Sequence, residues 1–178
     1  MMKILCFGDS NTYGYDPRSY IGSQYGAESR WVDLLAAKTG HITVNRGMNG
    51  RCIPKDGIDF ADADLALIML GSNDLLQGAS VETVTARMER FLTSLDIART
   101  VLLAPPEMKE GEWVWKTALI RDSKALIESY KALAARLGAK FIDTAGWDID
   151  LTFDGVHLSE KGHRIFAEKL ASALENLI

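Results

Sequence analysis

The sequence predicts an α/β protein in which one parallel, five-stranded sheet carries helices on both faces. Short apolar runs alternate along the chain with longer segments of helical periodicity, which is the order of βαβ units. The central run, "ADLALIML" at 63–70, is apolar on both faces, as expected for the middle of a parallel sheet. The chain has 178 residues, 47% of them hydrophobic, and shows no repeat or linker. One domain over 1–178 is therefore expected.

The other strands are expected where short apolar runs end in turn residues. "KILCF" at 3–7 comes first and stops at Gly8. "ITVN" at 42–45 and "TVLLA" at 100–104 follow, the latter ended by Pro105, and "AKFID" at 139–143 is the last. Their connections are long enough for right-handed crossovers, which favours a parallel sheet.

Four helices are expected between and after these strands. The segment 29–40 is closed by Gly40, a residue typical of the position just past a helix end. The segment 80–95 begins at Ser80, a natural N-cap, and keeps its apolar residues on one face. The segment 117–137 is long and amphipathic, and the last helix runs from Ser159 to the end of the chain.

Composition argues against several function classes. The net charge of −4 and the lack of Lys/Arg clusters argue against a nucleic-acid partner. Cys6 and Cys52 do not form a disulfide framework, and Cys6 lies in an apolar run as a small buried residue. No segment reaches the roughly 20 apolar residues of a membrane span, and the N-terminus lacks a signal-peptide pattern, so a cytoplasmic location is expected.

No metal and no cofactor are predicted. The chain has no Cys/His cluster with zinc-ligand spacing. Asp148, Asp150 and Asp154 lack the glycine and the distal glutamate of a calcium loop. A phosphate-bearing cofactor is a rival for the polar loop after the first strand, but no P-loop or G-x-G-x-x-G follows that strand.

Polar residues and glycines gather where the strands end. Ser10 follows the first strand, Gly50 closes "NRGMNG" after the second, Asn73 lies in "LGSND" after the third, and Asp154 and His157 lie in "DGVHLS" after the fifth. Ligands of parallel α/β sheets bind at the carboxyl ends of the strands. These residues are therefore the candidate site.

The residue types fit acyl transfer, which needs a nucleophile, a base, a group that orients the base and donors for an oxyanion. Ser10 offers the hydroxyl and His157 the base. Asp154 lies three residues before His157, on the same side of a turn, and can accept from one imidazole nitrogen. The N–H groups of Ser10 and Gly50 and the side-chain amide of Asn73 are the candidate oxyanion donors.

Structural interpretations compete with these roles. Ser10 alone could cap the next helix, and His157 alone could be a surface histidine. Asp9 and Asp74 are interpreted as residues that hold their loops, and His163 as a helix-surface or packing residue. Gly47 and Gly71 are interpreted as scaffolding.

Four ordered blocks, "FGDSN", "NRGMNGR", "LGSND" and "DGVHLSEKGH", resemble the SGNH (GDSL-type) hydrolases over nearly the whole chain. "GDSNTYGYDP" is also similar to the arylesterase-like branch. The resemblance maps the family's Ser, Gly, Asn and His onto Ser10, Gly50, Asn73 and His157. One departure is Asn11, where the name-giving motif has Leu; this residue is expected to pack or cap locally.

The resemblance implies a flavodoxin-like three-layer α/β/α sandwich and a metal-free serine esterase. Its substrates would be small-molecule carboxylic esters, such as short acyl or acetyl esters of small alcohols, aryl alcohols or sugars. A lysophospholipase or thioesterase-type lipid hydrolase is the alternative, and a non-catalytic binding module on the same scaffold is another. Acyl chain length, acyl transfer and a homo-oligomeric state are left open. So is whether four aromatic residues line the pocket or an interface: Tyr13, Tyr15, Trp113 and Trp115.

Overall fold

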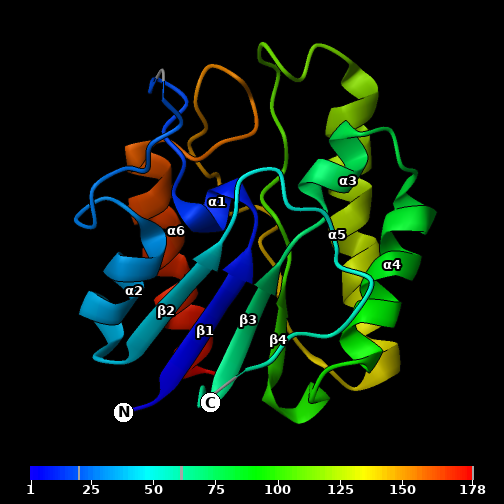
Figure 1. Cartoon of the computed structure of the whole chain (residues 1–178). Helices are drawn as coiled ribbons and strands as arrows, with labels where there is room; N and C mark the ends of the chain where they lie inside the picture. Colours follow the sequence, from blue (N-terminus) through cyan, green and yellow to red (C-terminus); the bar gives the residue numbers. More distant parts are fainter. Residues whose placement is uncertain (20, 61, 178) are drawn as a thin grey trace.

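The five-stranded parallel sheet is confirmed by the computed structural model, which describes residues 1–19, 21–60 and 62–177. Its strands are β1 (Lys3–Gly8), β2 (Ile42–Gly47), β3 (Leu65–Met69), β4 (Thr100–Leu103) and β5 (Lys140–Ile142). They pair in the order β2-β1-β3-β4-β5, all parallel. Figure 1 shows the arrowheads of β1, β2 and β3 pointing to one end of the molecule. Since β4 and β5 run parallel to them, every carboxyl end contributes to a single edge of the sheet.

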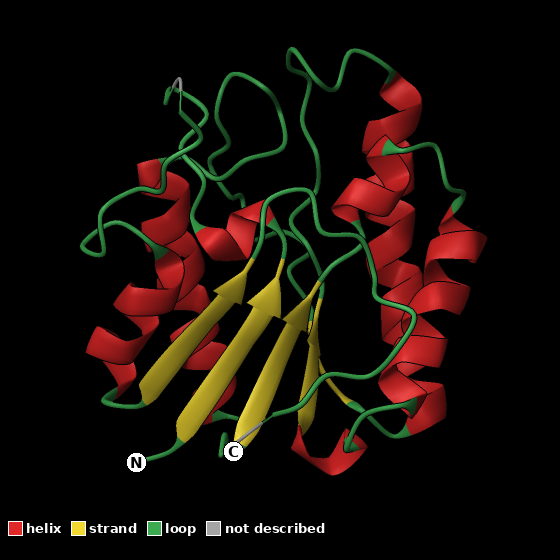
Figure 2. Ribbon diagram, viewed as in Figure 1, coloured by secondary structure: helices red, strands yellow, loops and turns green. Residues whose placement is uncertain are grey.

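Helices cover both faces of the sheet and make three layers (Figure 2). They are α2 (Trp31–Thr39), α4 (Val81–Thr93), α5 (Thr117–Leu137) and α6 (Glu160–Glu175). Successive residues of β1 face opposite layers: Leu5 belongs to the core under α4 and α5, whereas Cys6 belongs to the core under α2 and α6. This two-residue alternation is why a central strand must be apolar at every position. The predicted sandwich is therefore confirmed.

Three short helices were not predicted. They are α1 (Ser10–Tyr13), α3 (Ser72–Leu76) and the 3₁₀ turn η1 (Ile97–Arg99). Each is a single turn, too short to show a periodicity in the sequence. α1 is capped by Asp9, whose Oδ1 accepts the N–H of Asn11 at 3.0 Å. Ser10 is thus the first residue of that helix and not its cap.

Some predicted boundaries were too wide. The helix expected over 29–40 begins at Trp31, because the chain before it forms a turn in which the Ser29 N–H donates to the Gly26 carbonyl at 2.9 Å. The strand expected over 63–70 covers Leu65–Met69. In contrast, α5 has the predicted bounds, and Ser80 caps α4 as expected. Ser159, the expected first residue of the last helix, is the N-cap of α6.

Gly47 ends β2 where two segments approach closely. A Cβ at this position would lie 2.0 Å from the backbone nitrogen of Tyr13 in α1, so only glycine fits without a backbone shift. Gly71 is the N-cap residue of α3. Both glycines therefore serve as scaffolding, as the sequence indicated.

His163 lies in the core and not on the helix surface. It is fully buried on α6, its Nδ1 accepts the N–H of Trp31 at 3.3 Å, and its ring packs edge-on against Tyr25. In the described part of the chain no group accepts a hydrogen bond from Nε2. Burial lowers the pKa of His163 to about 3, and the nearby charge of Arg30 adds to the effect. The folded protein therefore favours the neutral imidazole.

This histidine makes the protein less stable in acid. The unfolded chain binds the proton near the ordinary pKa of about 6.5, whereas the folded chain binds it near 3. Stability is therefore full above about pH 6.5 and falls towards pH 3, by up to about 1.4 kcal/mol per pH unit. We expect His163→Gln to show a shallower loss of unfolding free energy between pH 6.5 and 4.5 in urea titrations. Equal slopes in the two proteins would contradict this role.

Candidate active site

Ser10, His157 and Asp154 form one hydrogen-bonded row. Ser10 Oγ lies 2.9 Å from Nε2 of His157, and Nδ1 of His157 lies 2.6 Å from Oδ2 of Asp154. Ser10 stands at the carboxyl end of β1, and the other two residues lie in the turn that leads into α6. All three side chains are buried. The sheet thus brings a hydroxyl from the start of the chain to an imidazole near its end.

Asp154 is held as a carboxylate. Its Oδ1 accepts the backbone N–H groups of Val156 at 2.8 Å and of His157 at 2.9 Å. Burial alone raises the pKa of Asp154, but the hydrogen bonds from His157 and Val156 outweigh it and lower the pKa to about 2. A carboxylate that accepts several hydrogen bonds can stay ionised despite burial. Asp154 therefore presents a fixed negative charge to the imidazole.

Asp9 shows the opposite behaviour beside the same serine. Burial raises its pKa to about 6, although the N–H of Asn11 and the charges of His157 and Arg51 lower it. The side chain of Asp9 accepts the N–H of Asn11, which is the cap of α1 described above. The contact supports the interpretation that Asp9 holds the loop.

A surface pocket of about 310 Å³ opens over Ser10 and His157. Gly50 and Asn73, the other two candidates, also line it. Gly50 has a φ of 72°, which favours glycine, and it sits in the turn after β2. The pocket therefore brings together residues that follow the first three strands with His157, which lies in the turn that leads into α6.

The turn that carries Gly50 and the short helix α3 that carries Asn73 are joined by hydrogen bonds. The Asn73 side-chain amide donates to the carbonyl of Arg51 at 3.1 Å. Asp74, fully buried, accepts the N–H of Ile53 at 3.0 Å and pairs with Arg87 at 2.7 Å. Asp74 thus anchors the segment after β3, as the sequence indicated, although this segment is the short helix α3; it also holds the chain just after Gly50.

Two of the four aromatic residues left open by the sequence line this pocket. Tyr15 and Trp113 both pack edge-on against the ring of His157, with centroids 4.8 Å and 5.1 Å away. Trp115 is 74% exposed and lies against Lys116, and neither it nor Tyr13 is among the lining residues described. Which aromatic residues line the pocket depends on the conformation of the loops over the sheet, and the periodicity of the sequence does not predict it.

Arg51 is a residue that the sequence reasoning did not single out. Its guanidinium donates to the carbonyl of Gly8 at 2.9 Å and lies over the ring of Phe7, 4.1 Å from the centroid. Its backbone carbonyl holds Asn73. Arg51 therefore links the ends of the first three strands, and its place directly after Gly50 was the only available signal.

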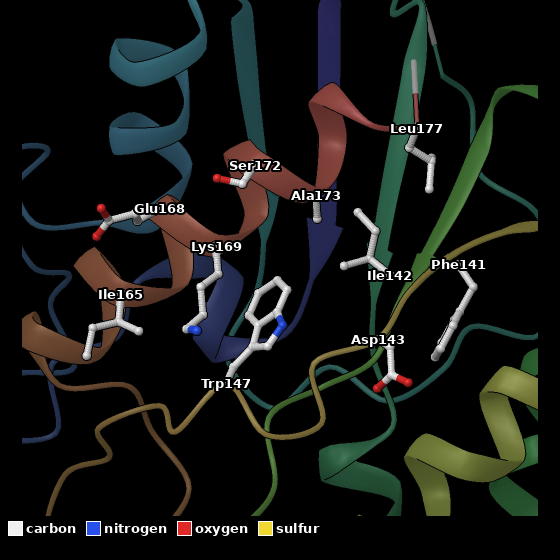
Figure 3. Close-up of a pocket in the computed structure, with 10 residues that line it drawn as sticks. All are labelled: Phe141, Ile142, Asp143, Trp147, Ile165, Glu168, Lys169, Ser172, Ala173 and Leu177. Atoms are coloured by element: carbon white, nitrogen blue, oxygen red, sulfur yellow. The ribbon is translucent and has the colours of Figure 1, made fainter.

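A larger hollow lies elsewhere on the molecule. Figure 3 shows Trp147 between α6 and the edge strand β5, with Ile142 on one side and Lys169 on the other. This hollow measures about 610 Å³ and shares no lining residue with the pocket over Ser10. Asp143 on its rim is paired with Lys131 at 3.0 Å. Its lining offers no row like that of Ser10, His157 and Asp154, so the smaller pocket is the candidate active site.

Other site types find little support in the described residues. Among residues 1–19, 21–60 and 62–177, no group of three or more His, Cys, Asp or Glu side chains could hold a metal ion. Within the same ranges no helix has the length and apolar content needed to cross a membrane. The row over the pocket places a hydroxyl beside an imidazole that contacts a carboxylate, an arrangement suited to nucleophilic catalysis.

A five-stranded parallel sheet with helices on both faces is consistent with the fold of the SGNH hydrolases. The chain belongs to the GDSL-like Lipase/Acylhydrolase family, whose model matches residues 6–165. This is a family of ester hydrolases, so the resemblance read from the four sequence blocks is confirmed.

Relatives of known sequence or structure agree with this membership. The chain is 29% identical to a GDSL lipase of Mycobacterium tuberculosis, over 94% of this chain and 79% of the relative. A solved structure from Agrobacterium tumefaciens, assigned as an arylesterase, is 29% identical with a TM-score of 0.82, and each chain is covered fully. Est24, a carbohydrate acetylesterase from Sinorhizobium meliloti, is 25% identical with a TM-score of 0.80 and again full coverage of both chains.

Proposed function

We propose that this protein is a serine esterase that hydrolyses carboxylic esters through an acyl-enzyme on Ser10. The observation that carries the proposal is the row from Ser10 Oγ through His157 to Asp154, with spacings of 2.9 Å and 2.6 Å. His157 Nε2 takes the hydroxyl proton as Ser10 attacks the ester carbonyl carbon. Asp154 accepts from Nδ1–H, which fixes the tautomer and stabilises the imidazolium.

The oxyanion is stabilised by donors around the same pocket. Ser10 is the first residue of α1, where the backbone N–H has no partner within the helix. Gly50 offers its N–H from the turn after β2. Asn73 uses one N–H of its amide to bind the carbonyl of Arg51, which leaves the second for substrate. Donors fixed before reaction stabilise developing charge without reorganisation.

Two further steps complete the reaction: release of the alcohol and hydrolysis of the acyl-enzyme. In the first, the tetrahedral intermediate collapses, the imidazolium returns its proton to the departing alkoxide, and the alcohol leaves. In the second, His157 takes a proton from water as the water attacks the acyl carbon. The carboxylic acid is released, and Ser10 recovers its proton.

A short acyl group and an aryl or sugar alcohol fit the pocket best. Its volume of about 310 Å³ lies at the lower end of ordinary ligand sites. Tyr15 and Trp113 flank His157, and Trp113 keeps 49% of its surface exposed as a flat apolar platform. Such a platform suits an aromatic ring or the apolar face of a sugar. The names of the two structural relatives, an arylesterase and a carbohydrate acetylesterase, support the same range.

Active-site labelling and an ester panel test this function together. We expect a fluorophosphonate probe to add to Ser10 in a peptide identified by mass spectrometry. We expect p-nitrophenyl acetate to be hydrolysed faster than the C8 to C12 esters, with acetylated sugars assayed alongside. A preference for long chains would favour the lipid-hydrolase alternative. A folded protein that neither reacts with the probe nor hydrolyses any ester would favour a binding module.

A further inference from the structure

Asn11, the residue that departs from the family's name-giving motif, connects the serine to the histidine loop. Its side-chain Nδ2 donates to the carbonyl of Val156 at 3.1 Å, and its Oδ1 accepts the N–H of Leu158 at 2.9 Å. These partners lie immediately before and after His157. Asn11 itself follows Ser10 directly, although 147 residues separate it from Leu158. One side-chain amide thus forms hydrogen bonds with the backbone on both sides of His157.

The two hydrogen bonds of the Asn11 amide have the pattern of a parallel β-bridge. In a parallel bridge, the peptide groups of one strand bond to the carbonyl before and the N–H after a residue of its neighbour. The Asn11 amide supplies the same donor and acceptor to the residues that flank His157. The His157 backbone is also engaged elsewhere: its N–H donates to Asp154, and its carbonyl accepts the N–H of Thr152 at 2.8 Å.

Burial makes these two bonds consequential. Asn11 is 4% exposed, Leu158 is 0% exposed and Val156 is 6% exposed. A buried carbonyl or N–H that loses its partner cannot form a hydrogen bond to water instead. Either the loop moves, or the polar group stays without a partner. The backbone of Asn11 is fixed as well, because its carbonyl accepts Nε1–H of the buried Trp31 at 2.8 Å. The side-chain amide of Asn11 is therefore attached to a backbone that is itself held in place.

We propose that Asn11 is a positioning residue that sets the separation of Ser10 and His157. This inference rests on the proposed esterase function and deepens it. Leu, the residue of the name-giving motif, has nearly the same size but offers neither donor nor acceptor. In this chain the coupling of nucleophile and base depends on a polar side chain that touches neither of the reacting atoms.

The test is Asn11→Leu, assayed with p-nitrophenyl acetate and with the fluorophosphonate probe. We expect kcat and the labelling rate to fall together by about 10- to 100-fold, since small misplacements of a base cost about that much, while KM changes less than about threefold. The low-field proton resonance of the short His157–Asp154 bond should persist. Its persistence would show that the base is still oriented by Asp154 but no longer held against Ser10.

Asn45→Leu is the matched control. Asn45 donates to the carbonyl of Thr12 at 3.0 Å and accepts the N–H of Gly47 at 2.9 Å, so it also ties down α1, but it does not contact the histidine loop. We expect this variant to have a lower Tm and a kcat within about threefold of the wild type. Equal losses of kcat in the two variants would overturn the proposal, because they would show a general disturbance of α1.

Asn11→Asp decides the question if Asn11→Leu does not fold. It keeps the acceptor for Leu158 and loses the donor to Val156, so we expect a fall in kcat of several-fold. A folded Asn11 variant with wild-type kcat and labelling rate would refute the positioning role alone. A wild-type protein without labelling or hydrolysis would refute the esterase function itself, so the two failures are distinguishable.

Discussion

Ser10→Ala is expected to lower kcat for p-nitrophenyl acetate by at least about 10³-fold, because no acyl-enzyme can form without the hydroxyl. The residual rate would come from the oxyanion donors and from binding. The fold should persist, since the substitution removes one oxygen from a residue whose backbone is held by α1 and by the Asp9 cap. Steady-state kinetics and circular dichroism measure the two expectations.

Ser29→Ala is a suitable control for the first experiment. Ser29 is as buried as Ser10, at 5% against 7% exposure, but it lies in the turn before α2 and does not line the pocket over His157. We expect its kcat to equal that of the wild type. If Ser10→Ala hydrolysed the ester at nearly the wild-type rate, the assignment of the nucleophile would be wrong.

Asp154→Asn is expected to lower kcat by about 10³- to 10⁴-fold, as the loss of the orienting carboxylate does in serine hydrolases with the same row. The carboxylate now accepts Nδ1–H and leaves Nε2 free to take the proton of Ser10. An amide in its place can offer N–H₂ to Nδ1, which favours the tautomer with its proton on Nε2. That tautomer cannot act as a base towards Ser10.

Asp154 keeps its negative charge at every pH used in an ordinary assay of the wild type. The pKa of Asp154 is about 2, so in the wild type its carboxylate stays ionised through the whole range of an ordinary assay. The stability that its ionisation contributes is present above the unfolded pKa of about 3.9 and is lost as the pH falls through 2. Between pH 5 and 8, therefore, protonation of Asp154 does not contribute to the pH dependence of the wild-type kcat.

Asp148→Asn provides the control in the same loop. Asp148 has a φ of 49°, a conformation that Asn also tolerates, and its side chain is 95% exposed. We expect its kcat to match the wild type. A comparable loss in Asp148→Asn, or an Asp154→Asn enzyme of nearly normal rate, would show that Asp154 does not orient His157.

Much of the fold could be predicted because the signals are local. The apolar runs, the cap Ser80, the helix start near Ser159 and the amphipathic segment that became α5 each depend on residues within a few positions of one another. Parallel topology then followed from the alternation of strands and helices. The candidate site could be located for the same reason, since the carboxyl ends of parallel strands share one edge.

Short helices and long-range contacts could not be predicted. α1 and α3 are single turns whose caps, Asp9 and Gly71, resemble ordinary loop residues in the sequence. The sequence does not distinguish a surface from a packing position for His163, because its burial depends on Trp31 and Tyr25, which are distant in the chain. Propensity and periodicity carry no information about such partners.

By itself the sequence predicted the α/β alternation, the family blocks and the candidate residues Ser10, Gly50, Asn73, Asp154 and His157, since each of these is a local pattern. Only the tertiary structure decided that Trp113 and Tyr15 flank His157 and that Asn11 bonds to the backbone on both sides of it. The physical reason is the strand order β2-β1-β3-β4-β5 and the packing of α6, which bring Ser10 and His157 within 2.9 Å across 147 residues of chain.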